Sequence, residues 1–146
     1  MKVLAVDPGE KRIGIALSDP TGTIASPLTV LAHASRTVDA AAIAQLAAEH
    51  GAEMIVVGQA LDAENQPTLQ SRRAARLAGS IRGQTSLPVV LWDESGSTQA
   101  ARSARIAMGV SRKKRRGHMD DLAAAVILQD YLDAQAGKPG FGINNQ

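Results

Sequence analysis

Acidic residues at the ends of apolar segments are the candidates for a catalytic or metal-binding role in this sequence. Asp7 ends the apolar run 2–7, Asp93 and Glu94 follow the run 88–92, and Asp120 and Asp121 open a helix-periodic segment. Carboxylates that converge without cysteine or histidine ligands suit a hard, oxygen-bound cation, Mg²⁺ or alternatively Mn²⁺. Such ions activate water and stabilise the leaving oxygen in phosphodiester hydrolysis.

The two acids at the start of the last helical segment differ in their angular position. At about 100° per residue, the stripe Ala124, Ile127, Leu128 and Tyr131 centres about 30° from Asp120 and about 70° from Asp121. An unpaired carboxylate near a core-facing stripe is costly, so Asp120 requires a cation or a hydrogen-bond donor. We therefore select Asp120 over Asp121 as the candidate ligand.

Each of these acids also has a purely structural interpretation. Asp7 precedes Pro8-Gly9 and could serve only as a turn former. Glu94 could complement the dipole of a following helix, and Asp120 could be an N-cap. The combination of acids from three separate parts of the chain favours the metal-site hypothesis.

The positive charge of the chain is concentrated in one run. This run comprises Arg112, Lys113, Lys114, Arg115 and Arg116; without it, 11 basic residues are outnumbered by 14 acidic ones. Such a run favours a local contact with a polyanion, although a solvated loop is the alternative. Lys11 and Arg12, just after Asp7, are further candidates for phosphate contact, or else the tip of a solvated hairpin.

The elements that must position these residues follow from hydrophobic periodicity. Apolar runs predict strands at 2–7, 13–18, 24–31, 54–58 and 88–92, and 3.6-residue periodicity predicts helices at 37–50, 69–82, 97–107 and 120–134. The short connection between the first two strands indicates a hairpin. Pro27 favours an edge position for the third strand. We therefore expect an α/β fold with a mixed five-stranded sheet, in which strands 1–3 are antiparallel, the later strands are parallel and helices cover both faces.

Strand ends determine where a site can form in such a sheet. In open α/β sheets, ligands bind beyond the carboxyl ends of the parallel strands, where Asp7 and the Asp93-Glu94 pair should share one rim. We expect one domain over 1–136, and a flexible tail over 137–146.

Composition excludes several functional classes. With no cysteine, the sequence has no disulfide framework and no Cys-type zinc site. No apolar stretch reaches membrane-spanning length, so we expect a cytoplasmic protein with no membrane partner. Three aromatic residues, Trp92, Tyr131 and Phe141, are too few for a base-stacking platform. A nucleic acid partner would therefore be held by its backbone or its shape.

The motif Asp7-Pro8-Gly9-Glu10-Lys11-Arg12-Ile13-Gly14-Ile15-Ala16-Leu17-Ser18-Asp19 resembles the opening of the YqgF-type family, a branch of the ribonuclease H-like nucleases. Further matches are residues 55–58, 88–94, and the segment from the basic run to 132, so the resemblance covers about residues 1–134. Members are described as Holliday-junction resolvases or as nucleases that process the 5′ end of pre-16S rRNA. The resemblance implies a ribonuclease H-like fold, with Asp7, Glu94 and Asp120 as metal ligands.

Two departures from the family pattern affect substrate positioning. Gln59-Ala60 replaces the usual Leu-Pro, and Ser95-Gly96 follows Glu94 where the family usually has arginine. Serine cannot offer the bidentate charged fork of that arginine.

These observations define the functional hypotheses. We expect an Mg²⁺-dependent nuclease acting on pre-16S rRNA, with a Holliday-junction resolvase as one alternative. A non-catalytic RNA-binding factor in ribosome assembly is the second alternative. An actin-like ATPase is disfavoured, because such proteins have two lobes and no Walker-type motif is present. The sequence leaves open a monomer or a homodimer.

Overall fold

The computed structural model describes residues 1–94 and 119–137, without the side chains of 119–121. Its strands are β1 (Val3–Pro8), β2 (Arg12–Ser18), β3 (Ala25–Ala32), β4 (Met54–Gln59) and β5 (Val89–Asp93), and its helices are α1 (Arg36–Glu49), α2 (Leu69–Arg82) and α4 (Met119–Ala136). The expected helix at 97–107, the basic run 112–116 and residues 138–146 lie outside the described residues.

The five strands form one sheet in the order β3-β2-β1-β4-β5. β1 pairs antiparallel with β2, and β2 pairs antiparallel with β3, whereas β1–β4 and β4–β5 are parallel. This is the mixed sheet expected from the sequence. Pro27 lies in β3, which is an edge strand, as its missing N–H requires.

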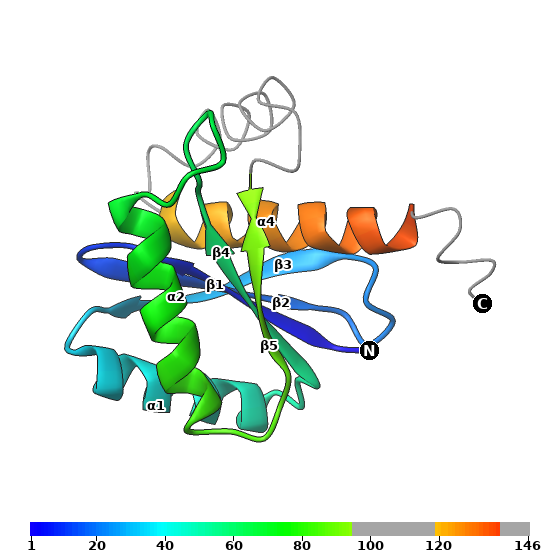
Figure 1. Cartoon of the computed structure of the whole chain (residues 1–146). Coiled ribbons are helices and arrows are strands. Elements are labelled where there is room, and N and C mark those ends of the chain that lie inside the picture. The colour runs from blue at the N-terminus through cyan, green and yellow to red at the C-terminus, as the bar shows by residue number, and fades with distance from the viewer. Residues whose placement is uncertain (95–118, 138–146) are drawn as a thin grey trace.

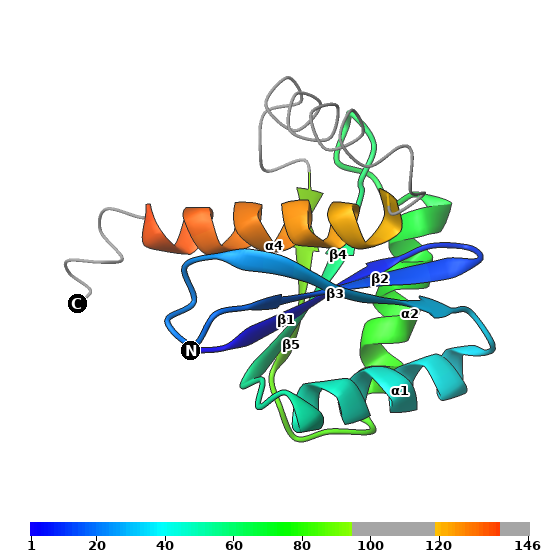
Figure 2. The ribbon, with the colours of Figure 1, turned by 180° about the vertical axis from the view of Figure 1, so that it is seen from behind.

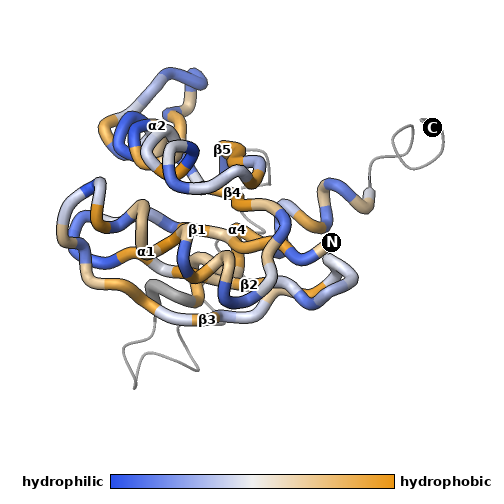
Figure 3. Tube along the Cα trace, turned by 90° about the horizontal axis from the view of Figure 1, so that it is seen from below, coloured by the Kyte–Doolittle hydropathy of each residue, from blue (hydrophilic) through white to orange (hydrophobic). Residues whose placement is uncertain are grey.

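Helices cover the two faces of the sheet unequally (Figures 1 and 2). α1 and α2 lie on one face, and α4 crosses the other. Side-chain alternation along β1 divides the core accordingly: Leu4 and Val6 pack with α1 and α2, whereas Val3 and Ala5 pack with α4. Figure 3 shows apolar segments concentrated along the strands between these layers.

Small side chains allow α4 to lie close to the sheet. Ala5, Ala16 and Val56 meet Ala124 and Ala125 of the helix in one buried cluster. At the rim of this cluster, the rings of Trp92 and Tyr131 meet edge to face with centroids 5.3 Å apart. Burial raises the pKa of the Tyr131 hydroxyl above its usual value.

No helix within residues 1–94 and 119–137 has both the length and the hydropathy needed to cross a membrane.

Local hydrogen bonds fix where the elements begin and end. Ser35 caps α1 by accepting a bond from the Val38 N–H. Thr68 and Ser71 form a reciprocal capping box at the start of α2. In α2, the apolar residues that give 69–82 its helical periodicity are buried, namely Ala74, Leu77, Ala78 and Ile81.

Ser18 links the start of β1 to the end of β2. Its side-chain oxygen accepts a 2.8 Å bond from the Val3 N–H and donates a 2.9 Å bond to the Asp19 carbonyl, and Ser18 is buried. The hydroxyl thus supplies an acceptor to a buried backbone N–H at the start of β1.

We predict that Ser18→Ala lowers the free energy of unfolding by about 1–3 kcal/mol, because the Val3 N–H would lose its acceptor. Urea denaturation measures this change. Ser26→Ala, at an exposed position in β3, is the matched control and should change stability by less than about 0.5 kcal/mol. Equal stabilities of the two variants would contradict the assigned role of Ser18.

Candidate active site

The carboxyl ends of β1, β4 and β5 bring Asp7 and Glu94 to one rim of the sheet. Asp7 is the fifth residue of β1 and pairs with Gly14 of β2. Glu94 immediately follows β5, whose last residues Trp92 and Asp93 pair with Gly58 and Gln59. β4 lies between β1 and β5, so the two acids come from strands separated by one neighbour.

Alternation places both acids on the face that α4 covers. Asp7 continues the Val3–Ala5 series that packs with α4, and Pro8 turns to the opposite face. In β5, Val90 and Trp92 pack with α4, so Glu94 continues their series and Asp93 falls on the α1–α2 face. The sequence left Asp93 and Glu94 unresolved until the resemblance favoured Glu94, and strand register supports the same choice.

Gly58 makes room for the Glu94 carboxylate. A Cβ at Gly58 would lie 3.1 Å from Glu94 Oε2, and 2.8 Å from Cδ1 of Ile127 in α4. The absence of a side chain therefore lets Glu94 extend over β4 beside the helix. Because neighbouring strands are about 4.8 Å apart, β1 lies one strand spacing beyond Gly58. The Glu94 carboxylate thus lies over β4, the strand between β5 and β1.

α4 brings the third acid toward the same rim. Asp120 is the second residue of α4 and precedes Ile127 by seven residues, so the two positions share a helix face about 10 Å apart along the axis. Figures 1 and 2 both show α4 beginning on the side where the β1–β2 hairpin projects. The side chains of Asp120 and Asp121 lie outside the described residues, so the preference for Asp120 stays a prediction.

The donor chemistry fits a hard divalent cation. Asp7 and Glu94 offer carboxylate oxygens on one face, without a competing cysteine, and both also take part in interactions within the protein. Among the described side chains, no three of His, Cys, Asp or Glu lie close enough to hold a metal ion. The described residues thus contribute two acids, and a complete ligand set requires a third.

Of the basic residues predicted to contact phosphate, only Lys11 and Arg12 lie within the described residues. Lys11 and Arg12 are exposed at the β1–β2 hairpin, where the Lys11 carbonyl accepts a 2.9 Å bond from the His33 N–H. The hairpin requires Gly9, whose added Cβ would lie 2.4 Å from the Arg12 carbonyl oxygen. Arg112, Lys113, Lys114, Arg115 and Arg116 lie outside the described residues.

Asp19, at the end of the opening motif, has a structural role. Its carboxylate accepts bonds from the Ile24 N–H, the Thr21 hydroxyl and the Thr23 N–H, and these bonds hold its pKa well below the usual range. The carboxylate stabilises the turn before β3.

The departure at Gln59-Ala60 has a local structural counterpart. The Ala60 N–H donates a 2.8 Å bond to the side-chain oxygen of Gln70, and the Ala60 carbonyl accepts a 2.7 Å bond from the Thr68 hydroxyl. Proline has no N–H and could not form the first bond. Ala60 therefore ties the end of β4 to the start of α2 in a way that a proline could not.

Comparison with known proteins identifies the family. A family model described as "RuvX: Holliday junction resolvase" matches residues 1–134. The chain belongs to the RuvX family. A RuvX relative from Syntrophus aciditrophicus, named "Putative pre-16S rRNA nuclease", is 40% identical over 134 residues, covering 92% of this chain and 89% of the relative. A protein of the same name from Geobacillus kaustophilus is 41% identical over 137 residues, covering 92% and 99%.

Solved structures show that this RuvX family member has the ribonuclease H-like fold expected from the sequence. Thermus thermophilus RuvC in complex with a Holliday junction superposes with a TM-score of 0.59 at 18% identity, covering 94% of this chain and 96% of RuvC. The fowlpox virus Holliday junction resolvase superposes with a TM-score of 0.55 at 14% identity, covering 93% and 99%. At these identities, the likeness concerns the fold alone.

We predict that Gly58→Ala destabilises the protein by about 1–3 kcal/mol, because its methyl group would overlap Ile127 and press on Glu94. Chemical denaturation measures the change, and a crystal structure of the variant should show Glu94 displaced. Gly79→Ala is the control, since a Cβ there meets nothing within 4 Å. In the interior of α2, alanine should stabilise by about 0.5–1 kcal/mol. A neutral Gly58→Ala with Glu94 unmoved would contradict the assigned role of Gly58.

Proposed function

We propose that this chain is an Mg²⁺-dependent nuclease that hydrolyses phosphodiester bonds in structured RNA, with the 5′ end of pre-16S rRNA as its substrate in the cytoplasm. Membership of the RuvX family and the names of its relatives support this proposal. The observation that carries it is the placement of Asp7 and Glu94 on one face of the sheet, on either side of Gly58.

In this proposal, Asp7, Glu94 and Asp120 hold the cation, which can be Mg²⁺ or Mn²⁺. When bound, the ion supplies an activated water and stabilises the leaving oxygen. Asp7 is fixed by the pairing of β1 with β2, and Glu94 by the end of β5. Asp120 requires only that the first turn of α4 be formed, which makes it the ligand position most sensitive to helix fraying. Residues 1–136 form the nuclease domain, as a monomer or a homodimer.

We assign the contacts with the nucleic acid backbone to basic residues. Lys11 and Arg12 project from the hairpin that follows Asp7, and we assign them to phosphate contact together with the run 112–116. Such contacts position a strand without reading its sequence.

Two alternatives have specific support. A Holliday-junction resolvase is favoured by the description of the family model and would take branched DNA. A non-catalytic RNA-binding factor is favoured by the departures at Gln59-Ala60 and Ser95-Gly96, which change the family pattern in the sequence but retain the three acids.

We predict that Asp7→Asn lowers the Mg²⁺-dependent rate of cleavage of a 16S-precursor 5′ leader by at least about 100-fold. Loss of a ligand should cost no less than loss of an outer hydrogen-bond partner of a metal site, which costs about 10–100-fold. Rates are measured on the RNA and on a four-way DNA junction with protein of matched stability.

Asp133→Asn is the control, because Asp133 is exposed near the far end of α4 and the substitution is chemically identical. This variant should cleave at the wild-type rate. Cleavage of the junction alone would favour the resolvase. RNA binding without Mg²⁺-dependent product ends from the wild type would favour the non-catalytic factor, and undiminished cleavage by Asp7→Asn would refute the metal site.

A further inference from the structure

A basic cavity lies on the opposite face of the sheet from Asp7 and Glu94. It has a volume of about 160 Å³ and lies between α1, α2 and the end of β1. Pro8, Ile13 and Leu77 contribute its apolar surface. Its polar side chains are those of His33, Arg36, Asp39, Arg73 and Arg76.

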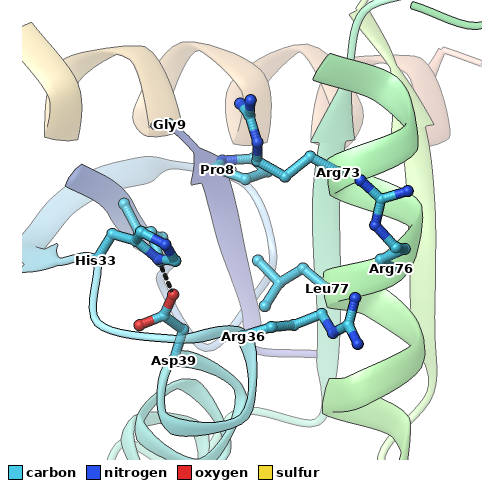
Figure 4. A pocket seen from close by; sticks show the side chains of 9 residues that line it. Pro8, Gly9, His33, Arg36, Asp39, Arg73, Arg76 and Leu77 are labelled. Carbon is cyan, nitrogen blue, oxygen red and sulfur yellow. Dashed lines mark hydrogen bonds and ion pairs between the residues drawn. The ribbon is translucent and has the colours of Figure 1, made fainter. Parts of the chain in front are cut away.

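Three guanidinium groups from two helices surround this volume (Figure 4). Arg73 and Arg76 are one turn apart in α2, whereas Arg36 is the first residue of α1 and extends toward α2. The N-terminus of α1 adds a partial positive charge on the same side. Buried side chains of α1 and α2 belong to one core cluster. This packing fixes the positions of the two helices that carry the three arginines.

The nearby carboxylates leave most of this charge uncompensated. Asp39 is buried and already accepts bonds from His33 Nδ1 at 2.5 Å and from the Ala34 N–H at 3.0 Å. Glu10 lies 3.6 Å from Arg73 and is 76% exposed, which makes that ion pair weak. Among the side chains of residues 1–94 and 122–137, no carboxylate forms an ion pair with Arg36 or Arg76.

We propose that this cavity binds a phosphate group. Guanidinium groups bind phosphate oxygens bidentately, and a phosphate would relieve the mutual repulsion of the three arginines. Pro8 faces the cavity and Asp7 faces α4, so the phosphate site and the carboxylates occupy the two faces of one strand end. A nucleic acid strand that crosses the end of β1 can therefore contact both. Contact between the cavity and a nucleic acid backbone rests on the proposed nuclease function. A free phosphate or a nucleotide is the other source of a phosphate group for this cavity.

The test compares Arg76→Gln with Arg72→Gln in the full chain. Both arginines are exposed in α2 and each substitution removes one charge, but Arg72 does not line the cavity. Arg36→Gln is the second cavity variant. Binding of a single-stranded RNA is measured without Mg²⁺ at several salt concentrations, and binding of inorganic phosphate and of a nucleoside monophosphate is measured by calorimetry.

We expect Arg76→Gln and Arg36→Gln each to weaken RNA binding by about tenfold, or about 1.4 kcal/mol, since each removes a charge-assisted hydrogen bond to phosphate. Each should lower the salt slope by about 0.7, the value for one single-strand phosphate contact. Arg72→Gln should change RNA affinity much less. If only phosphate or nucleotide binding is lost in the cavity variants, the cavity binds the free anion and not a backbone phosphate.

Equal effects of Arg76→Gln and Arg72→Gln on all three ligands would overturn the proposal. The nuclease function is tested separately, because Asp7→Asn should lower cleavage by at least about 100-fold while leaving phosphate binding in the cavity intact. A wild-type protein that binds phosphate in the cavity but cleaves nothing would refute the nuclease and leave the phosphate site standing.

Discussion

Side-chain alternation at the carboxyl ends of β1 and β5 is the constraint on which the proposed site depends. It turns Asp7 and Glu94 toward α4 and Pro8 and Asp93 toward the other face. A slip of one residue in one of these strands would reverse the side chains of that strand alone and would place Asp7 and Glu94 on opposite faces of the sheet. The buried Leu4 and Val6, which must face α1 and α2, therefore fix the register that also places Asp7.

Gly58 connects this register to the packing of α4. The close approach of Ile127 to the backbone of β4 leaves space for the Glu94 carboxylate only because residue 58 has no side chain. α4 is thus positioned by small residues in the sheet, among them Ala5 and Ala16, and its first turn carries Asp120. The same packing that stabilises the fold aligns the helix start with the rim where the strands end.

The sequence predicts the sheet and its helices because their core patterns are strong. The continuous run Ile55–Val57 and the stripe Ala74, Leu77, Ala78 and Ile81 are both buried as expected. The sequence pattern does not decide whether Asp93 or Glu94 is the candidate ligand, since that choice depends on which face of the sheet α4 covers. It also misses the cavity, because the spacing of Arg73 and Arg76 on one helix says nothing about Arg36, which lies far away in the sequence. Gly58 does carry a signal, since a glycine within a buried strand often marks a close approach.

Anomalous scattering of Mn²⁺ in crystals of the protein tests whether the three acids share one ion. We expect an ion bound by oxygens of Asp7 and Glu94, with Asp120 completing the protein ligands, at the distances typical of carboxylate–metal bonds. Anomalous density elsewhere, with those three carboxylates too far apart to share one ion at saturating Mn²⁺, would contradict it.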